Sequence, residues 1–224
     1  MAKVVIFGCG RGADVAARYL NADSTHEVVA FTVDRQYMSG DSFRGLPLVD
    51  FDKVDQLYCP SEYQLFAPLG FQRMNAARAE KYLEGKRKGY TFISYVSSTV
   101  VTHDIIQAGE NCFILENNTI NFDVRIGNNV VIWSTSQIGD KTIIADHAWI
   151  SSAVISGGVR IGEYSFLGAN CTIVDEVTVA ARCYVGAGAL ITKDTVEDGV
   201  YVVESTKRLL VDSGKFFSMI SAHK

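Results

Sequence analysis

The sequence contains little of what marks several large classes of protein. Its 224 residues include five cysteines, an odd number with no Cys-x-x-Cys pair, which argues against a disulfide framework and against a zinc site. The net charge of −4 provides no basic field, so we expect no nucleic-acid partner. No apolar run approaches the length of a membrane span and no signal-peptide pattern is present, so we expect a cytoplasmic protein with no membrane partner.

A glycine-rich turn near the start of the chain is the first feature that points to a ligand. Residues 3–7 are predicted to form a buried parallel strand, and residues 14–20 an amphipathic helix. Between them, Gly8, Gly10 and Ala13 fit the spacing Gly-x-Gly-x-x-Ala. Such a turn lets backbone N–H groups approach a phosphate at the N-terminus of the helix, although the same turn also occurs where nothing binds.

The rest of the N-terminal third predicts half of a dinucleotide-binding unit. A second strand at residues 27–33 is followed by Asp34, at the position where dinucleotide-binding folds hold a ribose. Further strands are expected at residues 46–49, 63–69 and 90–95, and a helix at residues 72–88. Only about 90 residues precede a change of pattern, so this half-sized α/β unit suits a mononucleotide rather than a complete NAD domain.

From about residue 105 a six-residue repeat dominates the sequence. Its positions are Ala108, Ile114, Ile120, Ile126, Ile132, Ile138, Ile144, Ile150, Ile161, Leu167, Ile173, Val179, Val185 and Ile191. A period of six fits neither a helix nor a hairpin meander, and it predicts a parallel β-helix of short strands. The aliphatic side chains should point inward, together with a column of small residues that includes Cys112, Cys171 and Cys183.

The repeat has one irregular place. Ile150 and Ile161 are eleven residues apart, one fewer than two repeats require. We place the missing residue at the corner formed by residues 156–158. Two interpretations stay open, because the deletion could be harmless or could mark a site.

A half-Rossmann unit followed by hexapeptide repeats resembles the left-handed β-helix sugar acyltransferases, of the sialic-acid O-acetyltransferase and bacillosamine N-acetyltransferase kind. The residues that carry the likeness are the turn at 8–13, Asp34, and residues 68–70, 161–170 and 185–189. The resemblance implies an α/β nucleotide-sugar-binding domain at residues 1–95. It further implies a left-handed parallel β-helix at residues 96–200 and a C-terminal tail at residues 201–224.

The resemblance also implies partners and site residues. It implies a homotrimer that works in polysaccharide or glycan synthesis, with active sites between neighbouring β-helices. The nucleotide part of a nucleotide-linked sugar would lie against Gly8, Gly10, Asp34, Arg35 and Gly70. The pantetheine of acetyl-CoA, or of another acyl-CoA, would meet backbone groups of Gly157, Ala169 and Ala187. Lys207 and Arg208 would contact CoA phosphates, or else form a solvated surface pair.

The sequence departs from this family at the catalytic base. The family's base is a histidine two residues after an inward aliphatic residue, and the matching position here, counted from Ile138, is Asp140. The best remaining candidate for a base, or for a group that contacts CoA, is His147, because alternation from the inward Ala148 would turn its side chain outward into the groove. The alternative is an ordinary surface histidine. Trp133 and Trp149 are also expected to point outward.

The replacement of the histidine bears on the acceptor. A sugar hydroxyl needs its proton removed as it attacks, and a positioned base supplies roughly 10²- to 10⁴-fold in rate. A neutral amine can attack a thioester without a positioned base. The sequence therefore favours acyl transfer to an amino sugar, with Asp140 orienting the amine or accepting its proton late. Two alternatives stay open: a non-catalytic nucleotide-sugar binder, and O-acetylation with His147 as base.

The end of the chain also departs from the family. Relatives often close the last coil with a Gly-x-Pro-Ala-Lys turn, and no proline follows Pro68 here. The apolar residues 216–220 are expected to pack on the β-helix or on a neighbouring chain.

Overall fold

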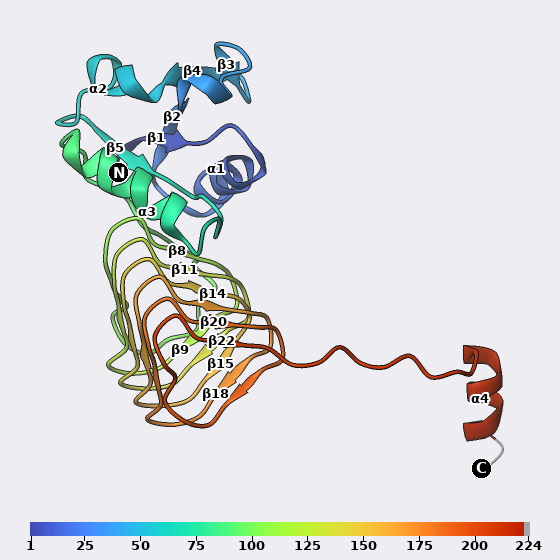
Figure 1. Ribbon diagram of the computed structural model, residues 1–224. Coiled ribbons are helices and arrows are strands. Elements are labelled where there is room, and N and C mark those ends of the chain that lie inside the picture. The colour runs from blue at the N-terminus through green and yellow to red at the C-terminus, as the bar shows by residue number, and fades with distance from the viewer. Residues whose placement is uncertain (222–224) are drawn as a thin grey trace.

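The computed structural model describes residues 1–221, which form an α/β unit, a triangular β-helix and a C-terminal helix on an extended tail (Figure 1). The α/β unit lies at one end of the β-helix. The fold class predicted from the sequence, a half-Rossmann unit followed by a left-handed parallel β-helix, is confirmed.

The α/β unit is built on one sheet with the strand order β3-β4-β2-β1-β5. Its elements are β1 (Lys3–Phe7), α1 (Arg11–Asp23), β2 (Glu27–Val33), β3 (Ser42–Phe43), β4 (Leu46–Asp50), α2 (Val54–Leu57), β5 (Tyr63–Phe66) and α3 (Ala76–Arg87), with 3₁₀ turns at Arg35–Tyr37 and Phe51–Lys53. All pairs are parallel except β3 with β4. The chain runs from β1 outward to β4 and then returns to the other side of β1 as β5, which makes the carboxyl ends of β1 and β5 a topological switch point.

Three element predictions in this unit differ from the structure. The strand expected at residues 63–69 ends at Phe66, as β5. The helix expected from residue 72 begins at Ala76, because Arg73, Met74 and Asn75 all have positive φ values between 50° and 67°. The strand expected at residues 90–95 is reduced to an isolated bridge between Leu65 and Phe92, with β6 following.

The β-helix consists of two-residue strands that follow one another at regular corners. They are β6 (Tyr95–Val96), β7 (Gln107–Ala108), β8 (Phe113–Ile114), β9 (Thr119–Ile120), β10 (Arg125–Ile126), β11 (Val131–Ile132), β12 (Gln137–Ile138), β13 (Ile143–Ile144), β14 (Trp149–Ile150), β15 (Val154–Ile155), β16 (Arg160–Ile161), β17 (Phe166–Leu167), β18 (Thr172–Ile173), β19 (Thr178–Val179), β20 (Tyr184–Val185), β21 (Leu190–Ile191) and β22 (Val200–Tyr201). The second residue of the strands from β8 to β21 is buried in one continuous core with Cys112, Cys171 and Cys183. The predicted inward column is therefore confirmed.

Three faces result from this winding. The junction face carries β6, β8, β11, β14, β17, β20 and β22, and its first coils meet the α/β unit. The uncharged face carries β9, β12, β15, β18 and β21, whose outward residues are Thr119, Gln137, Val154, Thr172 and Leu190. The arginine face carries β7, β10, β13, β16 and β19, and its outward residues include Arg125 and Arg160.

The irregular corner is not where the sequence analysis placed it. Ile138 pairs with Ile155 rather than with residue 156, so the step from Ile150 to Ile155 is the short one. The missing residue belongs to the corner at residues 151–153, between the junction face and the uncharged face. The corner at residues 156–158 has the regular length, and its Gly158 donates a backbone hydrogen bond to the Asp140 carbonyl at 2.8 Å.

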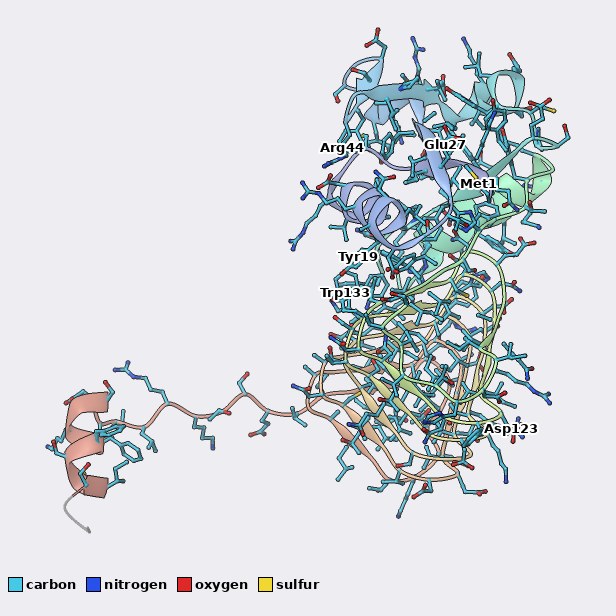
Figure 2. All side chains as sticks on the ribbon, turned by 180° about the vertical axis from the view of Figure 1, so that it is seen from behind. Met1, Tyr19, Glu27, Arg44, Asp123 and Trp133 are labelled. Atoms are coloured by element: carbon cyan, nitrogen blue, oxygen red, sulfur yellow. The ribbon has the colours of Figure 1, made fainter. Side chains whose placement is uncertain are left out.

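The two units share a hydrophobic core. Phe113, Leu115 and Val131 of the junction face are buried in the same cluster as the inner side chains of β1 and α1. Tyr19 of α1 donates a hydrogen bond to Glu116 at 2.7 Å, and Tyr19 and Trp133 lie on the same side of the junction (Figure 2). None of the helices described up to residue 221 is both long and apolar enough to cross a membrane.

Candidate functional site

A pocket of about 420 Å³ opens where the loops after β1 and β5 meet the junction face. Its lining residues are Arg11, Gly12, Val15, Pro68, Leu69, Gly70, Phe71, Gln72, Phe113, Val131, Trp133 and Trp149. The pocket therefore lies at the switch point of the sheet, where open α/β folds bind ligands. Most of its wall is apolar, and Arg11 supplies a cation at the N-terminus of α1.

The two predicted outward tryptophans form part of this pocket. Trp133 and Trp149 stack with their ring centroids 5.9 Å apart, and Trp149 also meets the edge of Phe71 at 5.3 Å. Both indoles point away from the β-helix core, as alternation predicts. The two rings cover the junction between the α/β unit and the β-helix of the same chain. Their outer faces form an aromatic wall of the pocket.

The glycine-rich turn has the geometry that brings α1 close to β5. Gly8 has a φ of 124°, which side-chain-bearing residues rarely adopt. A Cβ on Gly12 would lie 2.7 Å from the carbonyl oxygen of Pro68, so only glycine permits this approach of the helix to the loop after β5. The sequence analysis assigned the third position of the motif to Ala13 and missed the role of Gly12.

The residues predicted to line a nucleotide site come together at one edge of the sheet. Gly8 and Gly10 follow β1, Asp34 and Arg35 follow β2, and Gly70 lies in the loop after β5, so all five are at the carboxyl edge of parallel strands.

Asp34 is paired with a lysine that sequence reasoning missed. Lys81 of α3 lies 2.6 Å from Asp34 and also contacts Glu84. Burial against Phe7 and Phe51 works to lower the pKa of Lys81, but the two carboxylates raise it overall. This edge of the sheet therefore offers both an acceptor for hydroxyls and a cation.

A buried arginine joins α3 to the β-helix. Arg78 is fully buried, and its guanidinium donates to the backbone carbonyls of Gly70, Asn129, His147 and Ala148 at 2.9 to 3.3 Å and to the Asn75 side chain at 3.0 Å. All these acceptors are neutral. Burial lowers the pKa of Arg78 to about 9, so the group is still charged at neutral pH. Arg78 also lies 5.5 Å from the Trp149 ring, behind the pocket wall.

His147 does not point outward into a groove, and this prediction is wrong. It occupies a corner with a φ of 67°, where strand alternation does not apply, and its side chain is only 6% exposed. The imidazole packs on Tyr164, with centroids 4.6 Å apart, and lies beneath Tyr82 of α3. The residue is therefore enclosed at the junction of the two units.

A ladder of buried side chains fixes the protonation state of His147. The backbone N–H of Ala67 donates to Asn111 Oδ1, Asn111 Nδ2 donates to Asn129 Oδ1 at 2.7 Å, and Asn129 Nδ2 lies 2.9 Å from His147 Nδ1. Because the Ala67 N–H can only donate, Nδ1 must accept, and the imidazole is neutral. Burial, partly opposed by Asp146 and reinforced by Arg78, holds the pKa of His147 below its ordinary value.

Replacing His147 with asparagine is expected to remove a pH dependence of stability. The unfolded chain binds a proton at His147 near pH 6.5, whereas the folded chain does so only at lower pH. The stabilisation from the ladder is therefore complete above pH 6.5 and declines as the pH falls below it. In His147→Asn, the new Oδ1 can accept from Asn129, and asparagine tolerates positive φ. Urea titrations from pH 5 to 8 should show a smaller loss of stability in the variant. Parallel pH curves for both proteins would contradict this.

Asp140 lies apart from His147. It is exposed at the corner between the uncharged and arginine faces, whereas His147 is at the next corner, beyond β13. Gly157 occupies the equivalent place one coil further on, and a Cβ there would lie 2.9 Å from Asp140 Oδ1. One chain thus brings Asp140 and Gly157 together but separates both from His147.

The other residues expected to bind CoA lie elsewhere. Ala169 and Ala187 stack on consecutive coils at the corner between the junction and uncharged faces, where Gly188 donates to the Ala169 carbonyl at 2.9 Å. Lys207 and Arg208 are exposed in the extended tail before α4 (Ser213–Ser221). Within residues 1–221, no group of three His, Cys, Asp or Glu side chains could hold a metal ion.

Sequence comparison matches part of the β-helix to a known family. Residues 158–193 match the family described as Bacterial transferase hexapeptide (six repeats). The chain is 31% identical over 88 residues to the putative acetyltransferase YvoF of Bacillus subtilis, and 39% identical over 78 residues to the bifunctional protein GlmU of Bradyrhizobium sp.. These alignments cover 39% and 31% of this chain. They span about half of YvoF (51%) and 17% of GlmU.

Solved structures resemble the chain over almost its whole length. A variant of perosamine N-acetyltransferase from Caulobacter crescentus, in complex with CoA and GDP-perosamine, superposes with a TM-score of 0.79 at 22% identity, covering 92% of this chain and 98% of that one. The acetyltransferase domain of PglB from Neisseria gonorrhoeae gives 0.76 at 19% identity, with 89% and 96% covered. The likeness to left-handed β-helix sugar acyltransferases is thus confirmed in fold and repeat.

Proposed function

We propose that the protein transfers an acyl group, with acetyl as the first candidate, from an acyl-CoA to an amino group of a nucleotide-linked sugar. One observation carries this proposal. The α/β unit and the β-helix follow one another as in perosamine N-acetyltransferase over 92% of this chain, and that enzyme was solved with CoA and GDP-perosamine. The same proposal places this reaction in the cytoplasm, where the acceptor is a precursor of a polysaccharide.

The α/β unit is the proposed site for the nucleotide sugar. The turn that begins at Gly8 presents the backbone N–H groups around Gly10 at the start of α1, where a pyrophosphate is favoured, whereas the Gly8 N–H itself donates to the Thr32 carbonyl at 2.7 Å. Asp34 and Lys81 lie at the same edge of the sheet and can bind hydroxyl and phosphate groups of the nucleotide. The loop at Gly70 leads from this edge into the aromatic-walled pocket.

The β-helix corners are the proposed site for the acyl-CoA. Gly157 lies beside Asp140, whereas Ala169 and Ala187 lie at a different corner of the same chain. The two sets lie at opposite edges of the uncharged face. The proposal therefore includes the homotrimer implied by the resemblance, in which a corner of one chain meets a corner of its neighbour. Lys207 on the extended tail is a proposed contact for the CoA phosphates.

The proposed reaction does not require a strong base, because the attacking group is a neutral amine. The amine lone pair attacks the thioester carbonyl, the C–S bond breaks, and the products are an amide and the CoA thiol. The proton lost by nitrogen ends on the departing sulfur or passes through Asp140. Positioning of the amine and hydrogen bonds to the developing oxyanion supply the rest.

An acceptor screen tests the proposal. Acetyl-CoA is incubated with UDP-, GDP- and dTDP-linked amino sugars, and free thiol is measured; matched sugars with a hydroxyl in place of the amine serve as controls. We expect thiol release with at least one amino sugar and none with its hydroxyl counterpart. Binding of a nucleotide sugar in titrations, with no affinity for any acyl-CoA, would instead identify a non-catalytic binder.

Replacing Asp140 with asparagine should reduce the rate only modestly. Since an amine needs no base for its attack, the expected loss in kcat is smaller than the roughly 10²- to 10⁴-fold that a positioned base supplies. Steady-state kinetics of Asp140→Asn, with Lys141→Gln at the same corner as control, measure this. A loss of about 10²-fold or more would show that Asp140 acts as a base.

The same assay decides on O-acetylation through His147. The enclosure of the imidazole beneath Tyr82 and against Tyr164 gives that alternative no support. An O-acetylating enzyme with His147 as base would lose its activity in His147→Asn. We expect the variant to keep the parent rate.

A further inference from the structure

The C-terminal helix α4 packs on no other element within residues 1–221. Phe216, Phe217, Met219 and Ile220 are between 42% and 68% exposed. The tail leaves the end of the β-helix and holds α4 well away from the body in both views (Figures 1 and 2). Four large apolar side chains of one short helix thus face solvent together, which monomeric soluble proteins avoid.

The local sequence nevertheless specifies a helix here. Asp212 caps it, because its carboxylate accepts a hydrogen bond from the Lys215 N–H at 2.9 Å. Phe216 N–H donates to the Asp212 carbonyl at 3.0 Å, which closes the first turn. A helix of nine residues is too short to be stable alone in water, so α4 needs a surface to pack on.

The uncharged face of the β-helix offers a matching surface. Val154 and Leu190 point outward from it and are 40% and 62% exposed. None of its five outward side chains is charged, whereas the arginine face carries Arg125 and Arg160. The first coils of the junction face are covered by the α/β unit.

The charges beside the two surfaces are complementary. At the corner between the uncharged and arginine faces carboxylates outnumber lysines, because Asp140, Asp175, Glu176 and Asp194 lie there together with Lys141 and Lys193. Residues 202–221 carry three cations, Lys207, Arg208 and Lys215, against two acids, Glu204 and Asp212, which leaves the tail and α4 with a small net positive charge. An apolar helix with a net positive charge beside it therefore fits an uncharged face whose corner has a net negative charge.

We propose that α4 of each chain packs on the uncharged face of a second copy. The tail between β22 and α4 has about ten residues and spans ~30 Å when extended, which is enough to reach a neighbouring β-helix. Exchange of identical segments between identical chains satisfies both surfaces at once. In this arrangement Lys207 and Arg208 of one chain can reach the corner that carries Asp140 of the next.

Photo-cross-linking tests this contact in the full chain. A benzophenone amino acid replaces Phe217, and after irradiation a denaturing gel separates species of one and two chain masses. We expect a two-chain product whose cross-linked peptide contains Val154 or Leu190. The same probe at Ser218, on the opposite side of α4, is the control and should give little product.

Substitutions on the uncharged face provide the second measurement. Leu190→Asp should reduce the two-chain product about tenfold, because packing would bury a charge in an apolar contact. Thr178→Asp on the arginine face is the matched control and should not.

Three outcomes would overturn the proposal. They are a cross-link within one chain, a two-chain product that maps away from the uncharged face, and the absence of any two-chain product. Binding of the full chain to anionic phospholipid vesicles that is lost in Phe217→Ser would identify a membrane surface as the partner instead.

Discussion

Replacing Arg78 with methionine is expected to lower the free energy of unfolding by about 3 kcal/mol. Among the described residues, the buried carbonyls of Asn129 and His147 and the half-buried carbonyl of Gly70 accept only from this guanidinium. Each carbonyl left without a donor costs about 1–3 kcal/mol, and removal of a buried charge offsets part of the sum. Urea unfolding followed by circular dichroism measures the difference.

A surface arginine on the same stretch of chain is the control. Arg73 pairs with Glu80 in an exposed ion pair, and such pairs contribute little. Arg73→Met should therefore unfold at the same urea concentration as the parent chain. Equal stability of Arg78→Met and Arg73→Met would show that the network around Arg78 does not hold the two units together.

Replacing Gly139 with alanine is the second large effect we expect. A Cβ at this position would lie 2.5 Å from the backbone nitrogen of Gly157 on the next coil. Backbone cannot rotate away as a side chain can, so two coils must separate. We expect a loss of ~2–3 kcal/mol in stability, at the upper end of the usual cost of overpacking. The change should also lower acyl transfer, because it moves the corner that carries Asp140.

The matched control is Gly157→Ala at the same corner. There the added Cβ would meet only the carboxylate end of Asp140, at 2.9 Å, and that side chain can turn aside. The free energy of unfolding should stay near that of the parent, whereas the rate of acyl transfer should fall. If both variants were equally stable, the coil spacing at Gly139 would be less strict than the geometry indicates.

The periodic part of the molecule could be predicted from the sequence because each coil repeats the same burial. Every sixth residue from Ile114 stacks on its equivalent one coil away, so a simple count gives the register. The short corner was misplaced because the positions of Ile150 and Ile161 alone allow two solutions. Only the pairing of Ile138 with Ile155 chooses between them.

Residues at corners and on helices were harder to place. His147 has the positive φ also found at Asn111 and Asn129, so the inward-outward alternation of strands says nothing about its side chain. Arg78 and Lys81 lie in a helix whose exposed pattern looks ordinary. Their partners are carbonyls and a carboxylate far away in the sequence, and no local pattern reveals such contacts.

The shared core at one end of the β-helix makes the two ends of the solenoid unequal. The first coils are sealed by the α/β unit through Phe113 and Leu115, whereas within residues 1–221 the last coil is closed by β22 with Tyr201 and by no further unit. In a stack whose coils touch only their neighbours, unravelling begins where the terminal interface is weakest. The molecule should therefore fray from its C-terminal coil toward the sealed end, and amide hydrogen exchange should slow progressively from β21 back to β8.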